Sequence, residues 1–543
     1  MRPSSRPSPE FAASVSWGKR GRSSARAVSW TAGRMRLASG VVAALAAAVP
    51  VAGAAPAIAG PSEQVVVVGA DAVAALRAAG ARDLVAGELP TVATATLRSA
   101  QVARLRQRGL RVVADAPVQL TEKKNRRNAD PSDRLSVREV TGADRTGRTG
   151  RGVTVAVVDS GVDEVPGLTG RVIQGPNFSR DSGGDRYGHG TFVAGLIAGD
   201  GSAADGSDTG IVGVAPGARI LSVKIADRRG RSTVGRLTLG LAWVVAHEAT
   251  YGIDVVNLSV AVDRQTSYDA SPVNALVEAA WFSGMTVVAS AGNDGQRVTS
   301  APGNDPFVIT AGSLYDRNTS HLGDDRVSSF SNWGRTLDGF DKPEVAAPGE
   351  HVQSTLPVGS DLAARQKVQG LPVGYGQMSG TSMAAGVTSG QVALLLEERP
   401  GLGPDRVKGA LIASRQRGER GIRLERAFAA DQNANYGLRP SIALAIAYAQ
   451  LIVGTTDYAS IDWNTVAWHD VAWAKAVWTD AVWTDAVWTE ATWSEATWAD
   501  ATWAEAVWSE AVWSEATWTE AVWSEAVWSD SVASGQSFEP DAT

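Results

Sequence analysis

Between residues 136 and 426 the sequence alternates short, wholly apolar segments with longer helical patterns, and this alternation constrains the fold more than any other feature. The apolar segments are residues 153–158, 220–225, 253–259 and 285–290, and the clearest helical patterns are residues 234–247 and 273–282. A strand without a polar face is covered on both sides, as in a parallel sheet packed between helices. We therefore predict an α/β unit with a mainly parallel sheet and helices on both faces, whose active site lies at the carboxyl ends of the strands.

A smaller pattern of strands and helices precedes this unit. Its predicted strands are residues 64–68, 91–97 and 111–115, and its predicted helices are residues 71–79 and 99–108. We expect residues 60–120 to fold as a small α+β unit. Residues 121–135 are polar and charged and contain Pro131, which is typical of an accessible linker.

The amino terminus has the pattern of an export signal. Arg36 precedes an apolar run at residues 37–51, and a small-x-small pattern ends at Ala59. We predict a signal peptide over residues 1–59, and a start at Met35 would give a signal of ordinary length. The alternative is a transmembrane anchor, which is less favoured because the run is shorter than the ~20 residues that a span needs.

The composition and the short apolar segments argue against several kinds of site and partner. The chain contains no cysteine, which excludes disulfides, cysteine nucleophiles and thiolate metal sites but not export. Residues 442–453 are apolar but too few to cross a membrane, so we predict a packed helix within a helical or linker segment at residues 427–460. No basic stretch is interleaved with aromatic residues in the manner of a nucleic-acid-binding surface. We expect neither a transmembrane span nor a nucleic-acid partner.

A repeat with a period of five fills residues 461–532. Fourteen Trp residues recur at every fifth position, and from residue 455 onward sixteen Asp and Glu residues stand against one Lys. This period fits neither one face of an α-helix nor one face of a straight strand. Two interpretations remain, a solenoid with one repeat per side and a flexible acidic tail that docks through Trp onto cell wall, glycan or protein. Residues 533–543 are predicted to be a disordered terminus.

Three motifs place a carboxylate, an imidazole and a hydroxyl in positions suited to nucleophilic catalysis. Asp159 lies at the end of the first apolar strand, in the motif Val-Val-Asp-Ser-Gly. His189 begins a helical pattern, in the motif Gly-His-Gly-Thr. Ser382 begins another helical pattern, in the motif Ser-Gly-Thr-Ser-Met-Ala-Ala. A serine hydroxyl becomes a nucleophile when a histidine takes its proton, and a carboxylate on the other ring nitrogen fixes the tautomer. A fourth element, Ser-Ala-Gly-Asn-Asp-Gly, places Asn293 where its amide can donate to a developing oxyanion.

These motifs resemble the signatures of the subtilases, the subtilisin-like serine peptidases of family S8, over residues 134–426. The resemblance implies that Ser382 attacks a peptide carbonyl, that His189 is the base and that Asp159 orients it. Asn293 would stabilise the oxyanion. It also implies a cleft in which an extended peptide pairs as an added strand. The residues implied to line this cleft are Leu258, Ser259, Val260, Ala261, Ala291 and Gly292.

The resemblance further implies a secreted zymogen that acts on polypeptides. Residues 60–120 resemble an inhibitory prodomain, whose separation from the catalytic unit at residues 136–426 would occur within residues 121–135. A free-standing accessory domain is the alternative. Two rival functions remain, a subtilase scaffold that binds without catalysis and a chain whose repeat tail carries the function. The intact triad argues against the first rival.

The implied chemistry requires no cofactor. Subtilases often bind calcium as a structural ion, but the sequence does not place its ligands. We interpret Asp163 and Asp185 as solvated loop acids rather than as parts of a cation site.

Overall fold

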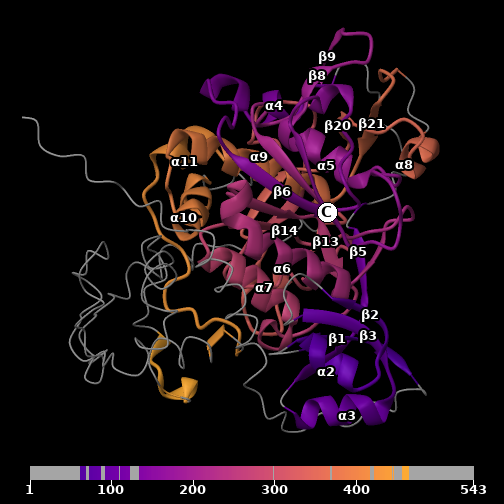
Figure 1. Cartoon of the computed structure of the whole chain (residues 1–543). Coiled ribbons are helices and arrows are strands. Elements are labelled where there is room, and N and C mark those ends of the chain that lie inside the picture. The colour runs from indigo at the N-terminus through magenta and orange to yellow at the C-terminus, as the bar shows by residue number, and fades with distance from the viewer. Residues whose placement is uncertain are drawn as a thin grey trace, which may run out of the picture.

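The structure is a computed structural model that contains a large α/β unit and a smaller sheet unit packed against it (Figure 1). The described residues are 62–68, 72–86, 92–108, 110–120, 122, 134–296, 299–366, 370–415, 421–442, 444–445, 455 and 457–463. The predicted signal peptide, most of the predicted linker, nearly all of the Trp repeat and the predicted disordered terminus lie outside these residues.

The large unit is built on a mainly parallel sheet of strand order β16-β15-β14-β12-β6-β10-β7, in which β19 also pairs with β15. Its strands are β6 (Thr154–Asp159), β7 (Val172–Asn177), β10 (Arg219–Lys224), β12 (Val255–Leu258), β14 (Thr286–Ser290), β15 (Ile309–Tyr315), β16 (Arg326–Val327) and β19 (Val345–Pro348). Every pair is parallel except that of β15 with β16. The central strands β6, β12 and β14 are buried along their whole length, as their apolar sequences predict.

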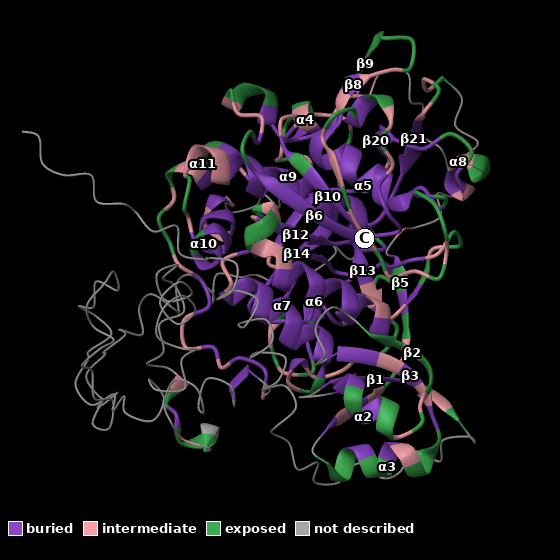
Figure 2. Cartoon of the chain, in the orientation of Figure 1, coloured by how far each residue is buried: buried purple, intermediate pink, exposed green. Residues whose placement is uncertain are grey.

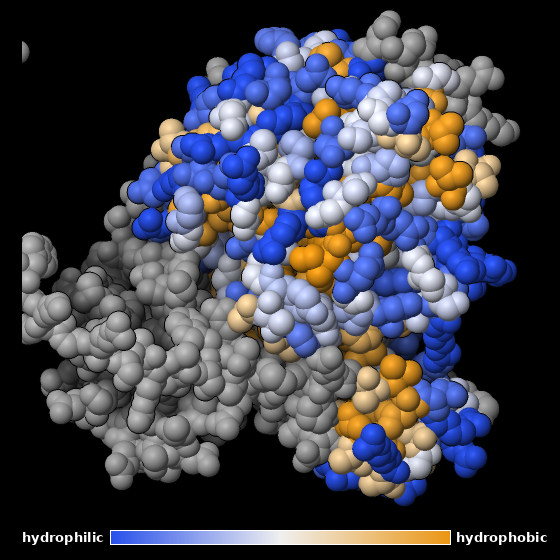
Figure 3. Space-filling model, turned by 45° about the horizontal axis from the view of Figure 1, so that its top comes forward, coloured by the Kyte–Doolittle hydropathy of each residue, from blue (hydrophilic) through white to orange (hydrophobic). Residues whose placement is uncertain are grey.

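Helices cover both faces of this sheet (Figure 1). On one face α5 (His189–Ala198) packs against α9 (Thr381–Glu398), and on the other α6 (Val234–Tyr251) packs against α7 (Pro272–Phe282). Figure 2 shows that these helices and the strands between them form the buried interior. The visible face of the large unit in Figure 3 is mainly hydrophilic, with a hydrophobic area near its centre. The predicted α/β class is therefore confirmed.

Smaller elements surround this core. The helices are α4 (Val137–Val140), α8 (Asp361–Arg365), α10 (Pro404–Ser414) and α11 (Leu424–Ala429), and the 3-10 turns are η1 (Ala143–Thr146), η2 (Pro166–Leu168), η3 (Tyr268–Ala270) and η5 (Tyr458–Ser460). Three antiparallel pairs are formed by β8 (Asp200–Ser202) with β9 (Asp208–Val212), β17 (Gly334–Arg335) with β18 (Asp341–Lys342), and β20 (Val352–Thr355) with β21 (Tyr375–Met378).

The small unit is an antiparallel sheet of order β2-β3-β1-β4 with two helices. Its elements are β1 (Glu63–Val68), α2 (Ala72–Ala78), β2 (Arg82–Ala86), β3 (Val92–Leu97), α3 (Ser99–Gln107) and β4 (Arg111–Ala114). Because side chains alternate along a strand, Val65 and Val67 pack with the helices while Val66 and Val68 pack with the core of the large unit. The sequence did not predict β2, whose residues are mostly exposed.

A short strand that the sequence did not predict leads from the small unit into the large one. β5 (Pro117–Leu120) pairs antiparallel with β11 (Arg231–Thr233) on one side and with β13 (Val260–Val262) on the other. Just before it, the Asp115 carboxylate accepts a hydrogen bond of 2.7 Å from the Gly235 N–H in the first turn of α6. A side chain at Gly235 would collide with the small unit, since its Cβ would lie 2.3 Å from Thr94 Cγ2.

No helix within the described ranges is long and apolar enough to cross a membrane. The helix predicted at residues 442–453 lies mostly outside those ranges. The predicted segment boundaries at residues 59, 120, 135, 426, 460 and 532 stay predictions.

Candidate active site

A strand end and a helix start bring Asp159 and His189 together. Asp159 is the last residue of β6, and His189 is the first residue of α5, which packs on that strand. Gly188 has a φ of 99°, a conformation that favours glycine. A Cβ at Gly190 would lie 2.1 Å from the Gly161 carbonyl oxygen. The glycines that flank the histidine therefore allow α5 to start directly against the end of β6.

The Asp159 carboxylate holds the imidazole of His189. Nδ1 of His189 lies 2.8 Å from Oδ1 and 3.0 Å from Oδ2 of Asp159, and both side chains are fully buried. Burial opposes protonation of the imidazole, but the charge and hydrogen bond of Asp159 outweigh it and raise the pKa of His189 above its ordinary value. The other ring nitrogen, Nε2, is buried and has no hydrogen-bond partner among the described residues. It is therefore available to accept a proton.

Asp185 fixes the start of α5, and its interpretation as a solvated loop acid is wrong. Only 1% of its surface is exposed. Its Oδ1 accepts hydrogen bonds from the Ser160 hydroxyl at 2.7 Å and the Gly188 N–H at 2.8 Å. Its Oδ2 accepts from the N–H of Thr191 at 2.8 Å and from the Thr191 hydroxyl at 2.7 Å. Burial outweighs these bonds and raises the pKa of Asp185. The carboxylate ties the end of β6 to the first turn of α5.

Asp163 does not complete a cation site with Asp185. Its Oδ1 accepts a hydrogen bond of 2.8 Å from the Asp185 N–H. Over the part of the chain that the structure describes, no group of three or more His, Cys, Asp or Glu side chains is arranged to hold a metal ion. These side chains assign no ligands to a structural calcium ion, and we derive no step through one.

Ser382 is the second residue of α9 and is held by a buried polar network. Its hydroxyl donates to the Ser259 carbonyl at 3.0 Å, and the Ser259 hydroxyl donates to the Ser382 carbonyl at 3.0 Å. Nδ2 of Asn257 donates to Ser259 Oγ at 2.9 Å, and its Oδ1 accepts from the Ser389 hydroxyl at 3.0 Å. These contacts fix the serine at a helix start, where the backbone N–H groups carry partial positive charge.

Asn293 is oriented by the residue before the serine. Its Oδ1 accepts hydrogen bonds from the Thr381 N–H at 2.9 Å and from the Thr381 hydroxyl at 3.1 Å. The same hydroxyl accepts from the Gly292 N–H at 3.1 Å. The carbonyl side of the Asn293 amide is thus fixed at Thr381, and its Nδ2 is buried.

The six predicted cleft residues divide into two groups. Val260 and Ala261 lie in β13 and pair with β5, opposite Leu120 and Gln119. The remaining four do not pair with β5 along these strands: Leu258 ends β12, Ser259 precedes β13, and Ala291 and Gly292 follow β14. The sequence motifs indicate one wall of the cleft, at β13, but not the opposite wall, β11.

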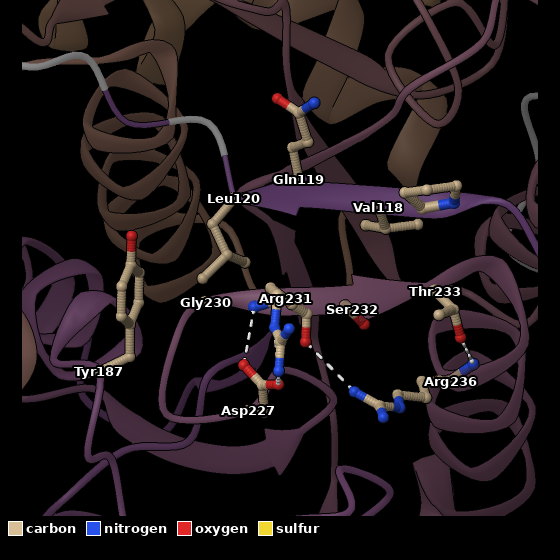
Figure 4. A pocket seen from close by; sticks show the side chains of 11 residues that line it. Val118, Gln119, Leu120, Tyr187, Asp227, Gly230, Arg231, Ser232, Thr233 and Arg236 are labelled. Atoms are coloured by element: carbon tan, nitrogen blue, oxygen red, sulfur yellow. Dashed lines mark hydrogen bonds and ion pairs between the residues drawn. The ribbon is translucent and has the colours of Figure 1, made fainter.

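Figure 4 shows the cleft beside β5. A pocket of about 430 Å³ is lined by β5, β11 and Tyr187. Val118 and Leu120 point from β5 toward β11, whereas Gln119 points away, as the alternation of a strand requires. Tyr187 stands beside Leu120 on the pocket wall. The sequence carried one signal for Tyr187, its position two residues before His189.

The comparisons with known proteins agree with this geometry. Residues 150–435, more than half of the chain, match the model of the subtilase family. The chain belongs to the subtilase family. The matched range of this subtilase contains the four residues of the predicted site, Asp159, His189, Asn293 and Ser382, and it ends before the Trp repeat.

Relatives of this subtilase are named as a serine protease or as subtilisins. Serine protease AprX of Bacillus subtilis (strain 168) is 36% identical over 272 residues, which cover 48% of this chain and 61% of AprX. Subtilisin BL of Lederbergia lenta is 34% identical over 260 residues, 48% of this chain and 81% of that protein. The match thus spans about three fifths of AprX.

A solved structure is also similar. Fervidolysin from Fervidobacterium pennivorans, a keratinolytic enzyme related to subtilisin, superposes with a TM-score of 0.53 at 25% sequence identity. The match covers 71% of this subtilase and 63% of fervidolysin. The fold of this chain is therefore subtilisin-like.

Proposed function

We propose that this chain is a serine endopeptidase that hydrolyses polypeptides through an acyl-enzyme on Ser382, and that it is made as a zymogen that processes itself. The observation that carries the proposal is the pairing of β5 with β11 and β13 next to Ser382. Peptide ligands bind such open strand edges as an added strand. A segment of the chain itself therefore occupies the position that a substrate would take.

The proposed reaction uses only protein groups. Ser382 Oγ turns from the Ser259 carbonyl toward His189 Nε2, gives up its proton there and attacks the peptide carbonyl carbon. The buried Asp159 carboxylate stabilises the imidazolium that forms. His189 then protonates the leaving amine, so that the peptide C–N bond breaks and an ester to Ser382 remains. Water, deprotonated by the same imidazole, hydrolyses that ester.

Negative charge on the carbonyl oxygen is stabilised at the start of α9. Asn293 supplies a side-chain N–H, and the backbone N–H groups of the first turn of α9 supply the partial positive charge of a helix start. These donors are in place before the reaction because Thr381 fixes the Asn293 amide.

The register of β5 supports a particular maturation site. Leu120 pairs with Val260, the first residue of β13. The residue before it, Ser259, has the carbonyl that accepts a hydrogen bond from the Ser382 hydroxyl. We therefore propose the Thr121–Glu122 bond, which begins one residue beyond the paired Leu120, as the bond that Ser382 cleaves. Cleavage there falls within the predicted linker.

The small unit acts as the inhibitor in this proposal. After cleavage, the piece that ends at Thr121 stays bound through the two strand pairings of β5 and through the hydrogen bond between Asp115 and Gly235. The product strand then blocks the cleft until the small unit is degraded or dissociates.

Export and a binding role for the tail complete the proposal. Export is supported by the signal pattern at residues 1–59. The acidic Trp repeat at residues 461–532 is proposed to retain the protease on cell wall, glycan or protein. Its test is the fraction of secreted enzyme that stays with cells, compared between the intact chain and a chain ending at residue 460.

The test of the proposed activity is covalent labelling. A fluorophosphonate reagent should label the purified wild-type chain on Ser382, and labelling should disappear in Ser382→Ala. Wild-type protein that is not labelled and does not hydrolyse casein would show that the fold serves binding rather than catalysis.

A further inference from the structure

Tyr187 contacts the residue that follows the proposed cleavage site. Its hydroxyl donates a hydrogen bond of 2.7 Å to Oε1 of Glu122. The Tyr187 side chain is buried, with 6% of the residue exposed, and its ring lies 6.5 Å from the ring of His189. The carboxylate of Glu122 is thus held next to the base that would protonate the leaving amine.

The phenol of Tyr187 is suited to hold an anion. Burial and then the negative charge of Glu122 raise the pKa of Tyr187, so the hydroxyl keeps its proton and donates. A hydrogen bond to a charged acceptor is stronger than one to a neutral amide. The contact therefore distinguishes a Glu side chain from a Gln side chain of the same shape.

A cation stands over the same ring. The guanidinium of Arg365, in α8, lies 5.9 Å from the centre of the Tyr187 ring. Two backbone hydrogen bonds dock α8 on this segment, from Asp361 N–H to the Arg186 carbonyl at 2.9 Å and from Leu362 N–H to the Tyr187 carbonyl at 3.0 Å. The Arg365 side chain is about half exposed and also pairs with Asp361 at 3.5 Å. It adds positive charge beside the phenol.

Resting on the proposed protease function, we propose that Tyr187 and Arg365 form a subsite that selects an acidic side chain at the first substrate residue after the cleaved bond. Glu122 fills this subsite in the zymogen. In other substrates, the subsite favours bonds that are followed by an acidic residue.

The test compares two peptides with the processed full-length enzyme. One has the sequence of residues 116–125, and the other differs only by Gln in place of Glu122. Wild type should cleave the Glu peptide with a kcat/KM about tenfold higher than that for the Gln peptide, the size expected for one partly solvated charged hydrogen bond. Tyr187→Phe should reduce this ratio to about one. The control Tyr315→Phe, at the exposed end of β15, should keep the wild-type ratio.

A second readout is the acid limb of the pH profile. The charge of Glu122 is one of the causes that raise the pKa of His189. The acid limb of kcat should therefore lie at higher pH for the Glu peptide than for the Gln peptide. A residue with only a structural role would not produce a difference between two peptides on one enzyme.

Each outcome decides a different claim. Equal kcat/KM for the two peptides, or an unchanged ratio in Tyr187→Phe, would overturn the subsite and leave the protease function standing. Cleavage of casein but of neither peptide would overturn it as well. If Tyr187→Phe does not fold, Arg365→Gln at the exposed side chain must lower the ratio. If casein is not cleaved either, the proposed function itself fails.

Discussion

The large unit contains two clusters of buried ionisable side chains, and only one of them adjoins the cleft. The catalytic cluster consists of Asp159, Asp185, His189 and Lys224, at the carboxyl ends of β6 and β10 and the start of α5. The distal cluster consists of Glu278, Asp305, Lys342, Glu344, Asp405 and Lys408, from α7, β18, α10 and the segments beside them. Burial shifts pKa values in both clusters. In the catalytic cluster it raises the pKa of Asp185 and lowers that of Lys224. In the distal cluster it raises the pKa values of Glu278, Asp305 and Asp405 and lowers that of Lys342.

In the distal cluster the charged groups are paired with one another or with neighbouring polar groups. Nζ of Lys342 lies 2.6 Å and Nζ of Lys408 2.8 Å from Oε1 of Glu344. Asp405 accepts a hydrogen bond of 3.0 Å from the indole N–H of Trp281. Burial raises the pKa of Asp405 to about 7 and lowers the pKa of Lys342 to about 8. These shifts accompany a role in holding α7 and α10 together.

The catalytic cluster differs because one of its side chains, His189, has a buried ring nitrogen that makes no hydrogen bond within the described residues. His189 Nε2 is buried and has no hydrogen-bond partner in the described part of the chain, and its neighbour Tyr187 lines the pocket beside β5. A perturbed pKa alone therefore does not mark the reactive site in this chain. What marks it is a proton-accepting atom left open beside an extended peptide.

The largest expected effect is a loss of peptidase activity that occurs on substitution at the active site but not in the distal cluster. Ser382→Ala should lower kcat for casein-derived peptides by about 10⁶-fold, the size given for loss of the nucleophile in subtilisin. Asp405→Asn in the distal cluster should leave kcat unchanged. Comparable losses in both variants would mean that the distal cluster also takes part in catalysis.

The next effect separates the clusters by pH-dependent stability. The pKa of Asp405 is higher in the folded chain than its ordinary value, so the folded chain binds this proton more tightly. Its favourable contribution is therefore greatest at low pH and is lost as the pH rises through about 7. In the Ser382→Ala background, which prevents self-digestion, denaturant unfolding should show a stability difference between Asp405 and Asp405→Asn that changes by up to about 4 kcal/mol between about pH 4 and about pH 8. A difference independent of pH would contradict the raised pKa.

A smaller loss is expected at the oxyanion donor. Asn293→Ala should lower kcat by about 10²–10³-fold with little change in KM, because the amide acts on charge that develops only in the transition state. Steady-state kinetics on a peptide substrate measure both constants. A rise in KM at unchanged kcat would assign Asn293 to substrate binding instead.

The smallest effect concerns the residue that ties β6 to α5. Asp185→Asn should lower kcat by about tenfold, since an amide nitrogen cannot accept the hydrogen bonds that position His189. KM should change little, and fluorophosphonate labelling of Ser382 should slow to the same extent. The matched control is Asp144→Asn, whose carboxylate is exposed. Equal kcat in Asp185→Asn and the control would show that Asp185 does not position His189 for catalysis.

The sequence predicts those elements of the fold whose pattern of apolar residues or motifs lies within the element itself. β6, β12 and β14 are apolar along their length, and His189 and Ser382 stand in motifs that open helices. β5 has no such signal, because its pairing partners β11 and β13 lie more than a hundred residues away in the chain. The burial of Asp185 likewise depends on the packing of α5 against β6.

The most direct test of the central claim is the intact mass of the secreted wild-type chain beside that of Ser382→Ala. We predict that the wild-type chain is separated into two pieces by cleavage at the Thr121–Glu122 bond, with the larger piece beginning at Glu122. Ser382→Ala should keep this bond intact. If both chains keep the bond, or if both lose it equally, then Ser382 does not cleave the strand that lies beside it.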